Sequence, residues 1–239
     1  MSDFARKCYL SPLTPIWQFA ILVATLSNVE ASETVLLSNL EQPANDPSPS
    51  FISASVWNGA VFITGNEPTR FGSATLVLRG GFPGHFWTTL YSDNGGTPGV
   101  PLLGGNLTGP SNPDSGQAKF FAGTDVILAP QTQYWLVAST DEPGTSGQSY
   151  GWYMTYSADY FSSAGWQLPN HGAYTVDAGA TWISTADALI PRPFFFEITG
   201  TVVPEPSTFA LLFGGVACFL LFAKRGPKAV EKKRGQSSL

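Results

Sequence analysis

Residues 147–151 (GQSYG) match the G-x-S-x-G pattern of serine hydrolases, with Ser149 in the position of the nucleophile. Asp159 and His171 follow it in the order of the acid and the base in α/β-hydrolases. A nucleophile elbow needs a strand before the serine and a helix after it, whereas here a Pro/Gly/Ser segment precedes and the strand-like residues 152–155 follow. The pattern therefore predicts a hairpin turn, with a secreted hydrolase as an unfavoured alternative.

The two histidines of the chain are the residue type most often found at metal sites. His85 and His171 stand 86 positions apart, with no H-E-x-x-H pattern and no neighbouring cysteine. Asp93 and Asn94 carry oxygen ligands suited to calcium, but the spacing of a calcium-binding loop is not met. We expect a tight turn at Asp93, no metal site and no cofactor.

An aromatic-rich stretch between Tyr150 and Trp166 has the composition of a sugar-binding surface. Exposed aromatic rings stack on sugar rings, whereas buried ones fill the core of a sandwich, which is the more frequent arrangement. The candidate stacking residues are Trp152, Tyr153, Tyr156 and Trp166, and the same stretch holds Tyr160 and Phe161. Sugar binding is therefore an alternative to be decided by whether Trp152 and Trp166 are exposed.

Hydrolysis of a glycosidic bond requires a pair of carboxylates. A glycosidase needs two carboxylates that face each other about 5–9 Å apart. Glu197, Asp177 and Asp187 are candidates only because carboxylates are few, which is no argument for a catalytic pair. We assign no catalytic residue and expect a protein that is not an enzyme.

The composition indicates which elements hold these side chains. Only 12% of the residues are charged, while 25 Gly and 19 Pro provide turns, which favours short strands over surface helices. Alternating or apolar segments predict strands, with turn signals between them. The expected strands are 34–37, 51–57, 61–64, 74–79, 86–91, 118–121, 126–128, 134–139, 150–155, 181–184 and 194–201. This pattern predicts an all-β fold over residues 32–203, an antiparallel β-sandwich of jelly-roll type.

Charge and cysteine content exclude several classes of protein for this domain. Residues 32–203 hold four basic and thirteen acidic side chains, a balance opposite to that of a nucleic-acid-binding surface. Cys8 and Cys218 both lie in the end segments, so no disulfide stabilises the middle. We expect no nucleic-acid partner, and stability that comes from sheet pairing and packing.

The first 31 residues have the three parts of a secretory signal peptide. Arg6 and Lys7 form a basic region, residues 16–26 an apolar region, and residues 29–31 (VEA) a small-x-small cleavage site. The mature chain is expected to begin near Ser32. A buried helix or a permanent anchor is the alternative.

A second apolar run lies close to the end of the chain. Residues 208–223 carry no charge and would span about 24 Å as a helix, somewhat less than the thickness of a hydrocarbon core. Lys224 and Arg225 open a basic cluster, which stays cytoplasmic under the positive-inside rule. We expect one transmembrane helix, with the domain outside and the basic tail, residues 227–239, inside.

Pro204, Glu205 and Pro206 come just before this run, where proline restrictions favour an extended and exposed backbone. Residues 203–225 (VPEPSTFALLFGGVACFLLFAKR) resemble the PEP-CTERM sorting signal, which joins a Pro-Glu-Pro triplet, a short span and a basic cluster. The resemblance implies export, a single-pass membrane intermediate and processing by exosortase, a membrane enzyme of bacteria that make extracellular polysaccharide. It assigns the sorting motif to the triplet and the transmembrane stop to Lys224 and Arg225, within a signal over residues 204–226.

The middle of the chain also resembles choice-of-anchor domains of the R type, which are attached to varied surface-sorting signals. The matching segments are 89–99 (TLYSDNGGTPG), 128–139 (LAPQTQYWLVAS), 165–168 (GWQL) and 194–201 (FFFEITGT). The resemblance implies an exported β-sandwich at the cell surface or in the extracellular matrix. The resemblance assigns no activity to that domain. We expect a structural or adhesive role in the extracellular matrix, and the alternative is a module that binds extracellular polysaccharide through the aromatic stretch between Tyr150 and Trp166.

Overall fold

The fold is that of a computed structural model, which describes residues 32–43, 48–123, 125–144, 149–186 and 192–203. The expected signal peptide, sorting signal and basic tail all lie outside these residues. In the ranges that the structure describes there is no helix with the length and apolar character needed to cross a membrane.

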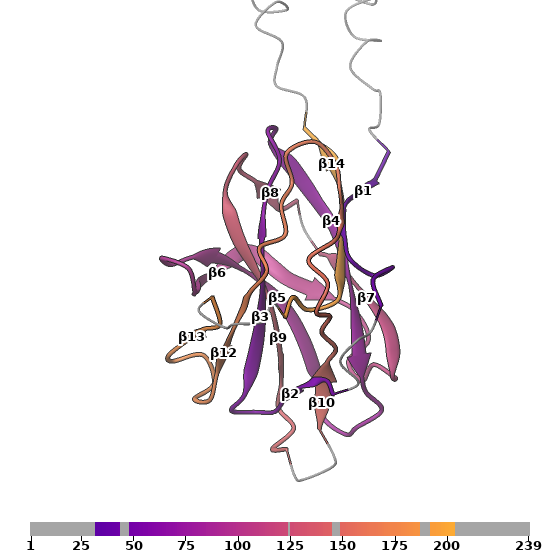
Figure 1. The fold of residues 1–239 in the computed structure, drawn as a ribbon. Helices are drawn as coiled ribbons and strands as arrows, with labels where there is room; N and C mark the ends of the chain where they lie inside the picture. The colour runs from indigo at the N-terminus through magenta and orange to yellow at the C-terminus, as the bar shows by residue number, and fades with distance from the viewer. Residues whose placement is uncertain (1–31, 44–47, 124, 145–148, 187–191, 204–239) are drawn as a thin grey trace, which may run out of the picture. The chain divides into compact units, whose positions relative to one another are not determined.

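Fourteen strands form within the described residues (Figure 1). They are β1 (Thr34–Ser38), β2 (Ser50–Ile52), β3 (Trp57–Ile63), β4 (Thr69–Arg79), β5 (Phe86–Asp93), β6 (Pro98–Thr108), β7 (Gly116–Ala122), β8 (Ile127–Leu128), β9 (Gln133–Thr140), β10 (Tyr150–Trp152), β11 (Phe161–Ser162), β12 (Gly172–Thr175), β13 (Ile183–Ser184) and β14 (Phe196–Val202). The predicted all-β class is confirmed.

All strand pairs are antiparallel, and the main path of pairing falls into two halves. One half has the order β11-β1-β14-β4-β7 and the other the order β6-β5-β9-β3-β12-β13. The halves join where β6 pairs with β7 at just two positions, Leu107↔Ala122 and Thr108↔Phe121. The architecture is therefore sandwich-like, as the sequence predicted.

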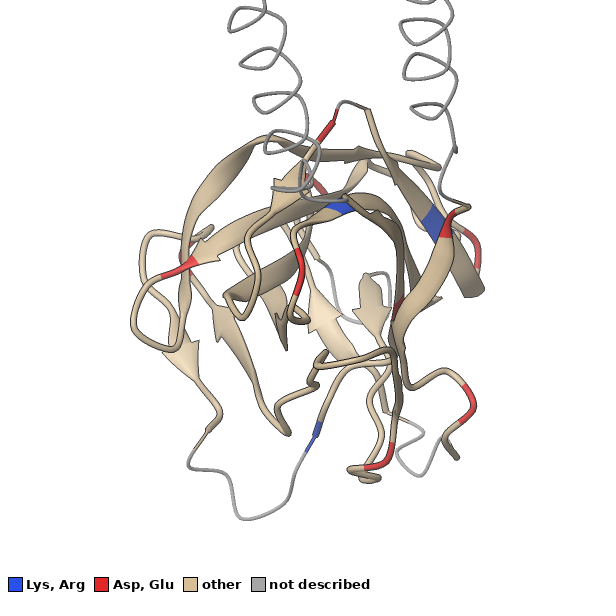
Figure 2. Ribbon diagram, turned by 90° about the horizontal axis from the view of Figure 1, so that it is seen from above, with Lys and Arg blue, Asp and Glu red and all other residues tan. Residues whose placement is uncertain are grey.

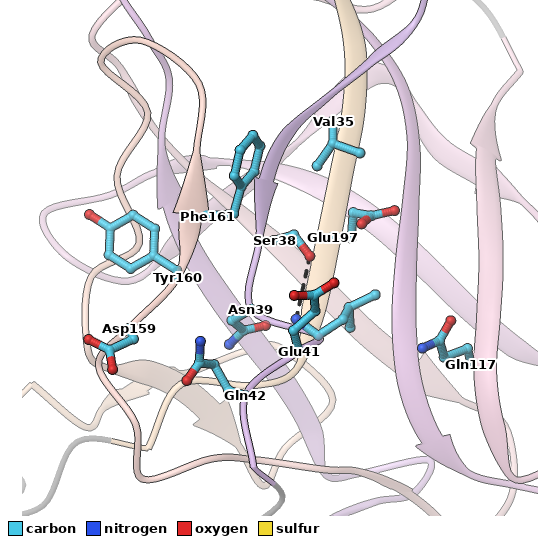
Figure 3. A pocket seen from close by; sticks show the side chains of 11 residues that line it. Val35, Ser38, Asn39, Glu41, Gln42, Gln117, Asp159, Tyr160, Phe161 and Glu197 are labelled. Atoms are coloured by element: carbon cyan, nitrogen blue, oxygen red, sulfur yellow. Dashed lines mark hydrogen bonds between the residues drawn. The ribbon is translucent and has the colours of Figure 1, made fainter.

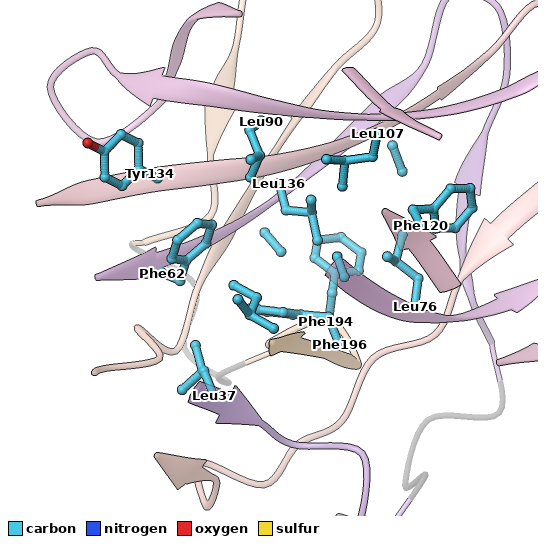
Figure 4. Packing of buried hydrophobic residues seen from close by; sticks show 14 of the residues in the cluster. Leu37, Phe62, Leu76, Leu90, Leu107, Phe120, Tyr134, Leu136, Phe194 and Phe196 are labelled. Carbon is cyan, nitrogen blue, oxygen red and sulfur yellow. The ribbon is translucent and has the colours of Figure 1, made fainter. Parts of the chain in front are cut away.

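Alternation along the strands places the core between the two halves (Figure 4). On β14, Phe196 and Ile198 are buried while Glu197 between them faces outward. Phe120 of β7 is also buried, between the outward-facing Lys119 and Phe121. This core contains no cysteine, so the buried apolar area is the main source of its stability.

A second, smaller cluster covers the other face of β3 and β9. Val61, Trp135, Val137 and Ala173 are buried there, and Trp57, Tyr91 and Trp182 pack against them. Strands β3 and β9 are therefore covered on both faces, which explains the continuous apolar run WLVA in β9.

Two expected strands are shorter or divided in the structure. The segment 51–57 is interrupted by a turn in which Ser53 N–H donates to Val56 O at 2.8 Å, so β2 ends before it and β3 begins after it. The segment 150–155 pairs regularly up to Trp152, and Met154 then makes an isolated bridge with Phe194. In the first place Ser53 Oγ also accepts from Val56 N–H at 3.1 Å, which closes the turn. In the second, backbone hydrogen bonds from Tyr153 N–H to Val77 O and from Thr155 N–H to Pro193 O continue past the end of β10.

Candidate functional site

Two groups of predicted site residues lie outside the described residues. The sorting motif Pro204, Glu205 and Pro206 is one, and the transmembrane stop at Lys224 and Arg225 is the other. Both stay predictions from the sequence. The residues expected to stack on sugars are described, and they can be placed.

Trp152 and Trp166 are both buried, which removes them as sugar-stacking residues. Trp152 is 0% exposed, its Nε1–H donates to Phe195 O at 2.8 Å, and its ring stacks on Phe194 at 4.6 Å. Trp166 is 4% exposed and stacks on Phe62 at 6.0 Å. Neither indole offers a face to a ligand, so both belong to the core.

Tyr153 and Tyr156 are partly buried and do not extend an exposed platform. The backbone of Tyr153 bonds to Val77 O and Phe195 N, which fixes it beside the strands. The ring of Tyr156 lies under the guanidinium of Arg192, at 5.4 Å from Cζ to the ring centroid. The four candidate rings thus do not form a common surface.

The three residues of the hydrolase pattern occupy separate surroundings. Ser149 is buried directly before β10, so a strand and not a helix follows it. Asp159 is exposed, and its backbone N–H donates to Ser157 Oγ. His171 packs edge-on against Trp135, with 6.1 Å between the ring centroids. A strand therefore follows Ser149, as expected, while residues 145–148 of the predicted turn lie outside the described residues.

Within the described ranges, no three His, Cys, Asp or Glu side chains are grouped so as to hold a metal ion. Of the three carboxylates considered for glycosidase chemistry, Asp187 lies outside the described residues. Asp177 sits in a surface turn, and Glu197 lines a groove.

The groove has a volume of about 700 Å³, a size typical of ligand sites (Figure 3). Its lining comes from Val35 and residues 38–42, from residues 159–161, from Gln117 of β7 and from Glu197 of β14. In the close view Tyr160 and Phe161 lie on one side and Gln117 on the other, with Glu197 between them. Strands far apart in sequence thus combine to build it.

Asn39 fixes the floor of the groove. Its side-chain Nδ2–H donates to Phe194 O at 2.9 Å, and its Oδ1 accepts from Phe196 N–H at 2.8 Å. The Asn39 side chain is 1% exposed, so both bonds are shielded from water. They lock the residues after β1 onto the beginning of β14.

The rim of the groove is tied down as well. Gln42 N–H donates to Asn39 O, and its Oε1 accepts from Ser157 Oγ at 2.9 Å. The β1–β11 pairing then sets Phe161 opposite Ser38. The residues 159–161 and 38–42 are therefore held against each other by hydrogen bonds, which preorganises the groove.

The groove is acidic. Glu41, Asp159 and Glu197 contribute carboxylates, and no Lys, Arg or His is among its lining residues. Along the sheet, Glu197 pairs with Thr75, which in turn pairs with Lys119, so this base lies two strands away. Figure 2 shows how sparse basic residues are among the described residues.

A smaller cavity of about 270 Å³ is lined by Asn58, Tyr174, Arg192 and Phe194 among others. The Asn58 amide already donates to Phe51 O at 2.9 Å. Its Oδ1 accepts from Ser50 Oγ at 3.1 Å. This cavity has less room and fewer open polar groups than the groove.

The turn after β5 is organised by Asp93, as a structural residue. Its carboxylate accepts from Trp135 Nε1–H at 2.8 Å, from Gln133 Nε2–H at 2.7 Å and from Gly96 N–H at 3.2 Å. Gly95 and Gly96 have φ of 65° and 90°, a region that favours glycine. The sequence predicted this tight turn, and the structure adds its link to the second cluster.

Replacing Asp93 with alanine is expected to lower the free energy of unfolding by about 2–3 kcal/mol, because the buried Trp135 indole N–H loses its acceptor. Urea unfolding followed by far-UV circular dichroism measures the loss. The control is Asp114→Ala, at an exposed acidic position elsewhere. Equal stability of the two variants would contradict the structural role of Asp93.

His171 lies beside the same cluster. Burial against Trp135 lowers the pKa of His171, and the nearby Asp93 carboxylate opposes part of this effect. The folded state therefore binds a proton less readily than the unfolded chain. The neutral His171 side chain therefore stabilises the fold fully above the ordinary histidine pKa of about 6.5, and this stabilisation declines as pH falls below that value.

Asp177 holds a surface turn through two threonines. Its Oδ1 accepts from Thr175 Oγ1–H, and its Oδ2 accepts from Thr181 Oγ1–H at 2.6 Å. These bonds to the carboxylate, with that from Thr181 N–H, lower the pKa of Asp177 to about 2. The stabilisation is present above the unfolded-state pKa of about 3.9 and is lost as pH falls towards 2.

Titration of Asp177 by NMR is expected to give a pKa of about 2 in the wild type. Thr181→Val removes one donor to the carboxylate and is expected to raise that pKa towards the ordinary value. Thr89→Val, at a distant threonine, serves as the matched control. An unchanged Asp177 pKa in Thr181→Val would contradict this explanation.

Sequence reasoning did not identify most of the groove. Glu41, Gln42 and Gln117 are polar residues in ordinary surroundings, and nothing in their local pattern marks them. Tyr160 and Phe161 were part of the aromatic stretch, and these two rings line the groove. The high aromatic content of this stretch was the one sequence feature that pointed to the groove, but it did not indicate which rings are exposed.

Two comparisons with known proteins gave no match. No protein-family model matches the chain, and no curated protein matches it either. The likeness to PEP-CTERM signals and choice-of-anchor domains therefore rests on the motifs quoted above.

Proposed function

We propose that this chain is an exported, surface-sorted protein without enzymatic activity, with a structural or adhesive role in the extracellular polymer matrix or cell envelope. Its domain is a β-sandwich of jelly-roll type. The observation that carries the proposal is the pairing of a secretory signal at residues 1–31 with a tripartite sorting signal at 204–226.

The way in which the domain is stabilised is compatible with export. The described core consists of apolar side chains on paired strands and contains no cysteine. A domain of this kind can fold after export without an oxidation step. The groups of the hydrolase pattern, Ser149, Asp159 and His171, lie in separate surroundings.

Sorting assigns distinct tasks to the end residues. Lys224 and Arg225 hold the end of the span at the cytoplasmic face, so the domain stays outside in a single-pass intermediate. Pro204, Glu205 and Pro206 present an extended segment to an exosortase-type membrane enzyme. Processing then releases the domain from its own span.

Cell fractionation tests this proposal. The protein is expected in the envelope or the medium, with a mature N-terminus near Ser32, and a variant that lacks residues 1–31 is expected to stay in the cytosol. Immunoblotting with an antibody against the β-sandwich measures the distribution. Full-length wild-type protein dissolved in the cytosol would contradict the proposal.

Carbohydrate binding is a second candidate, and the groove is the observation that favours it. The rings of Tyr160 and Phe161 line a cavity of about 700 Å³ together with side-chain amides and carboxylates. Rings combined with a few polar groups are typical of ligand sites. The second candidate thus uses these two residues in place of the buried Trp152 and Trp166.

A further inference from the structure

We propose that the groove binds a glycan chain that carries no acid groups and that it prefers amino sugars. This inference rests on the second candidate function above and names the class of ligand for the same groove. Three features of the lining carry it: an exposed aromatic ring, open hydrogen-bond acceptors, and the absence of positive charge.

Phe161 provides the aromatic surface. Its side chain is 58% exposed at the edge of the groove, although its backbone is held in the β1–β11 pairing opposite Ser38. A large ring fixed in this way is ready to pack against the apolar face of a sugar. An ammonium group over the ring would add a cation–π interaction, which a neutral or acidic sugar does not provide.

The polar groups call for a ligand that donates hydrogen bonds. Within the described part of the chain, the carboxylates of Glu41, Asp159 and Glu197 have no hydrogen-bond or ion-pair partner, and an ionised carboxylate only accepts. Gln117 can both donate and accept. Sugar hydroxyls and ammonium groups satisfy these acceptors, and ammonium gives the stronger, charge-assisted bonds.

Charge then separates the glycan classes. The lining holds three carboxylates and no base, and residues 32–203 hold thirteen acidic against four basic side chains. A uronic acid or sulfated chain would bring further negative charge to this surface, so repulsion disfavours it. The same field attracts a chain of amino sugars.

A glycan fits this lining better than a basic peptide does. An extended peptide would gain most of its affinity from main-chain bonds to a free strand edge. Here β11 occupies the edge of β1 at Leu37 and Ser38 and is itself two residues long, so little strand edge is left for a peptide beside Phe161. Recognition therefore depends on side chains, which suits a hydroxyl-rich or amine-rich ligand.

Calorimetry with the full chain in mild detergent tests the inference. The probes are hexamers of glucosamine, glucose (β1,4-linked) and galacturonic acid, with hexalysine as the peptide probe. We expect the glucosamine hexamer to bind about tenfold or more tightly than the galacturonate hexamer, and a few-fold more tightly than the glucose hexamer. The preference is expected to shrink in about 0.5 M salt.

Two variants locate the binding. Glu197→Gln is expected to reduce the preference for glucosamine over glucose by a few-fold while glucose binding persists. Phe161→Ala is expected to weaken both hexamers by roughly fivefold or more. Glu67→Gln makes the same change as Glu197→Gln, and Trp87→Ala removes another exposed aromatic ring; both positions lie outside the groove, so both variants should leave binding unchanged. Far-UV circular dichroism checks that each variant is folded.

Different binding results would contradict different parts of the proposal. Equal binding of glucosamine and glucose hexamers, both weakened in Phe161→Ala, overturns the amino-sugar preference and leaves the second candidate standing. Binding of no glycan overturns both, as does tighter binding of hexalysine. Equal losses in the variants and their controls overturn the assignment to the groove. Fractionation measures the export proposal independently of all these results.

Discussion

Replacing Trp152 with alanine is expected to lower the free energy of unfolding by about 3–5 kcal/mol. The indole is 0% exposed, stacks on Phe194 at 4.6 Å and donates from Nε1–H to Phe195 O at 2.8 Å. The substitution removes a large apolar side chain and leaves both a cavity and an unpaired buried carbonyl. Urea unfolding followed by far-UV circular dichroism measures the loss.

Trp87→Ala is the matched control, because Trp87 is 46% exposed and lies outside the main core. Its expected effect is within about 1 kcal/mol. Should Trp152→Ala cost no more than Trp87→Ala, the placement of Trp152 in the core would be wrong. Sugar stacking by Trp152 would then have to be considered again.

This difference matters for any test of sugar binding. A typical domain is stable by about 5–15 kcal/mol, so losing 3–5 kcal/mol populates unfolded chain under mild stress. Substitution of Trp152 or Trp166 would then reduce binding by unfolding the domain. Phe161 is the informative position, because its exposed ring can be removed with little loss of packing.

Strands with clear alternation could be predicted from the sequence. The expected segment 118–121 corresponds to β7, where the buried Ala118 and Phe120 alternate with the exposed Lys119 and Phe121. The β14 pattern was equally clear, because Phe196 and Ile198 alternate with polar residues. Local alternation reports burial on one face, and that is sufficient to locate such strands.

Strand β6 (Pro98–Thr108) was not predicted, because its two prolines and its Gly-Gly pair read as turn signals. In the structure, β6 pairs with β5 along one side, with two shifts of register. Its other side pairs with β7 only at Leu107 and Thr108. A strand with one largely free edge tolerates proline, since the missing N–H removes no ladder bond there.

The groove could not be predicted for a different reason. Its lining joins residues near 40, 117, 160 and 197, and strand pairing alone brings them together. Nor could local pattern show that Trp152 is buried, because its burial depends on the pairing of β10 with both β2 and β4. Aromatic content predicted a concentration of rings, and tertiary packing decided which of them face solvent.

Glu205→Ala is expected to abolish most C-terminal processing. Between residues 198 and 223 Glu205 is the single charged side chain, so it is the one ionic group that a processing enzyme can read ahead of the span. Sites built to bind a polar group discriminate strongly against substrates that lack it, here by roughly tenfold or more. Glu67→Ala, at an exposed acidic position in the domain, is the control and should be processed normally.

The most direct test of surface sorting is the mass of the mature C-terminus. Protein is recovered from envelope and medium, and the C-terminal peptides of wild type, Glu205→Ala and Glu67→Ala are identified by mass spectrometry. Wild type and Glu67→Ala are predicted to lack the basic tail of residues 227–239, while Glu205→Ala keeps it. A C-terminus at Leu239 in both wild type and Glu205→Ala would contradict the account.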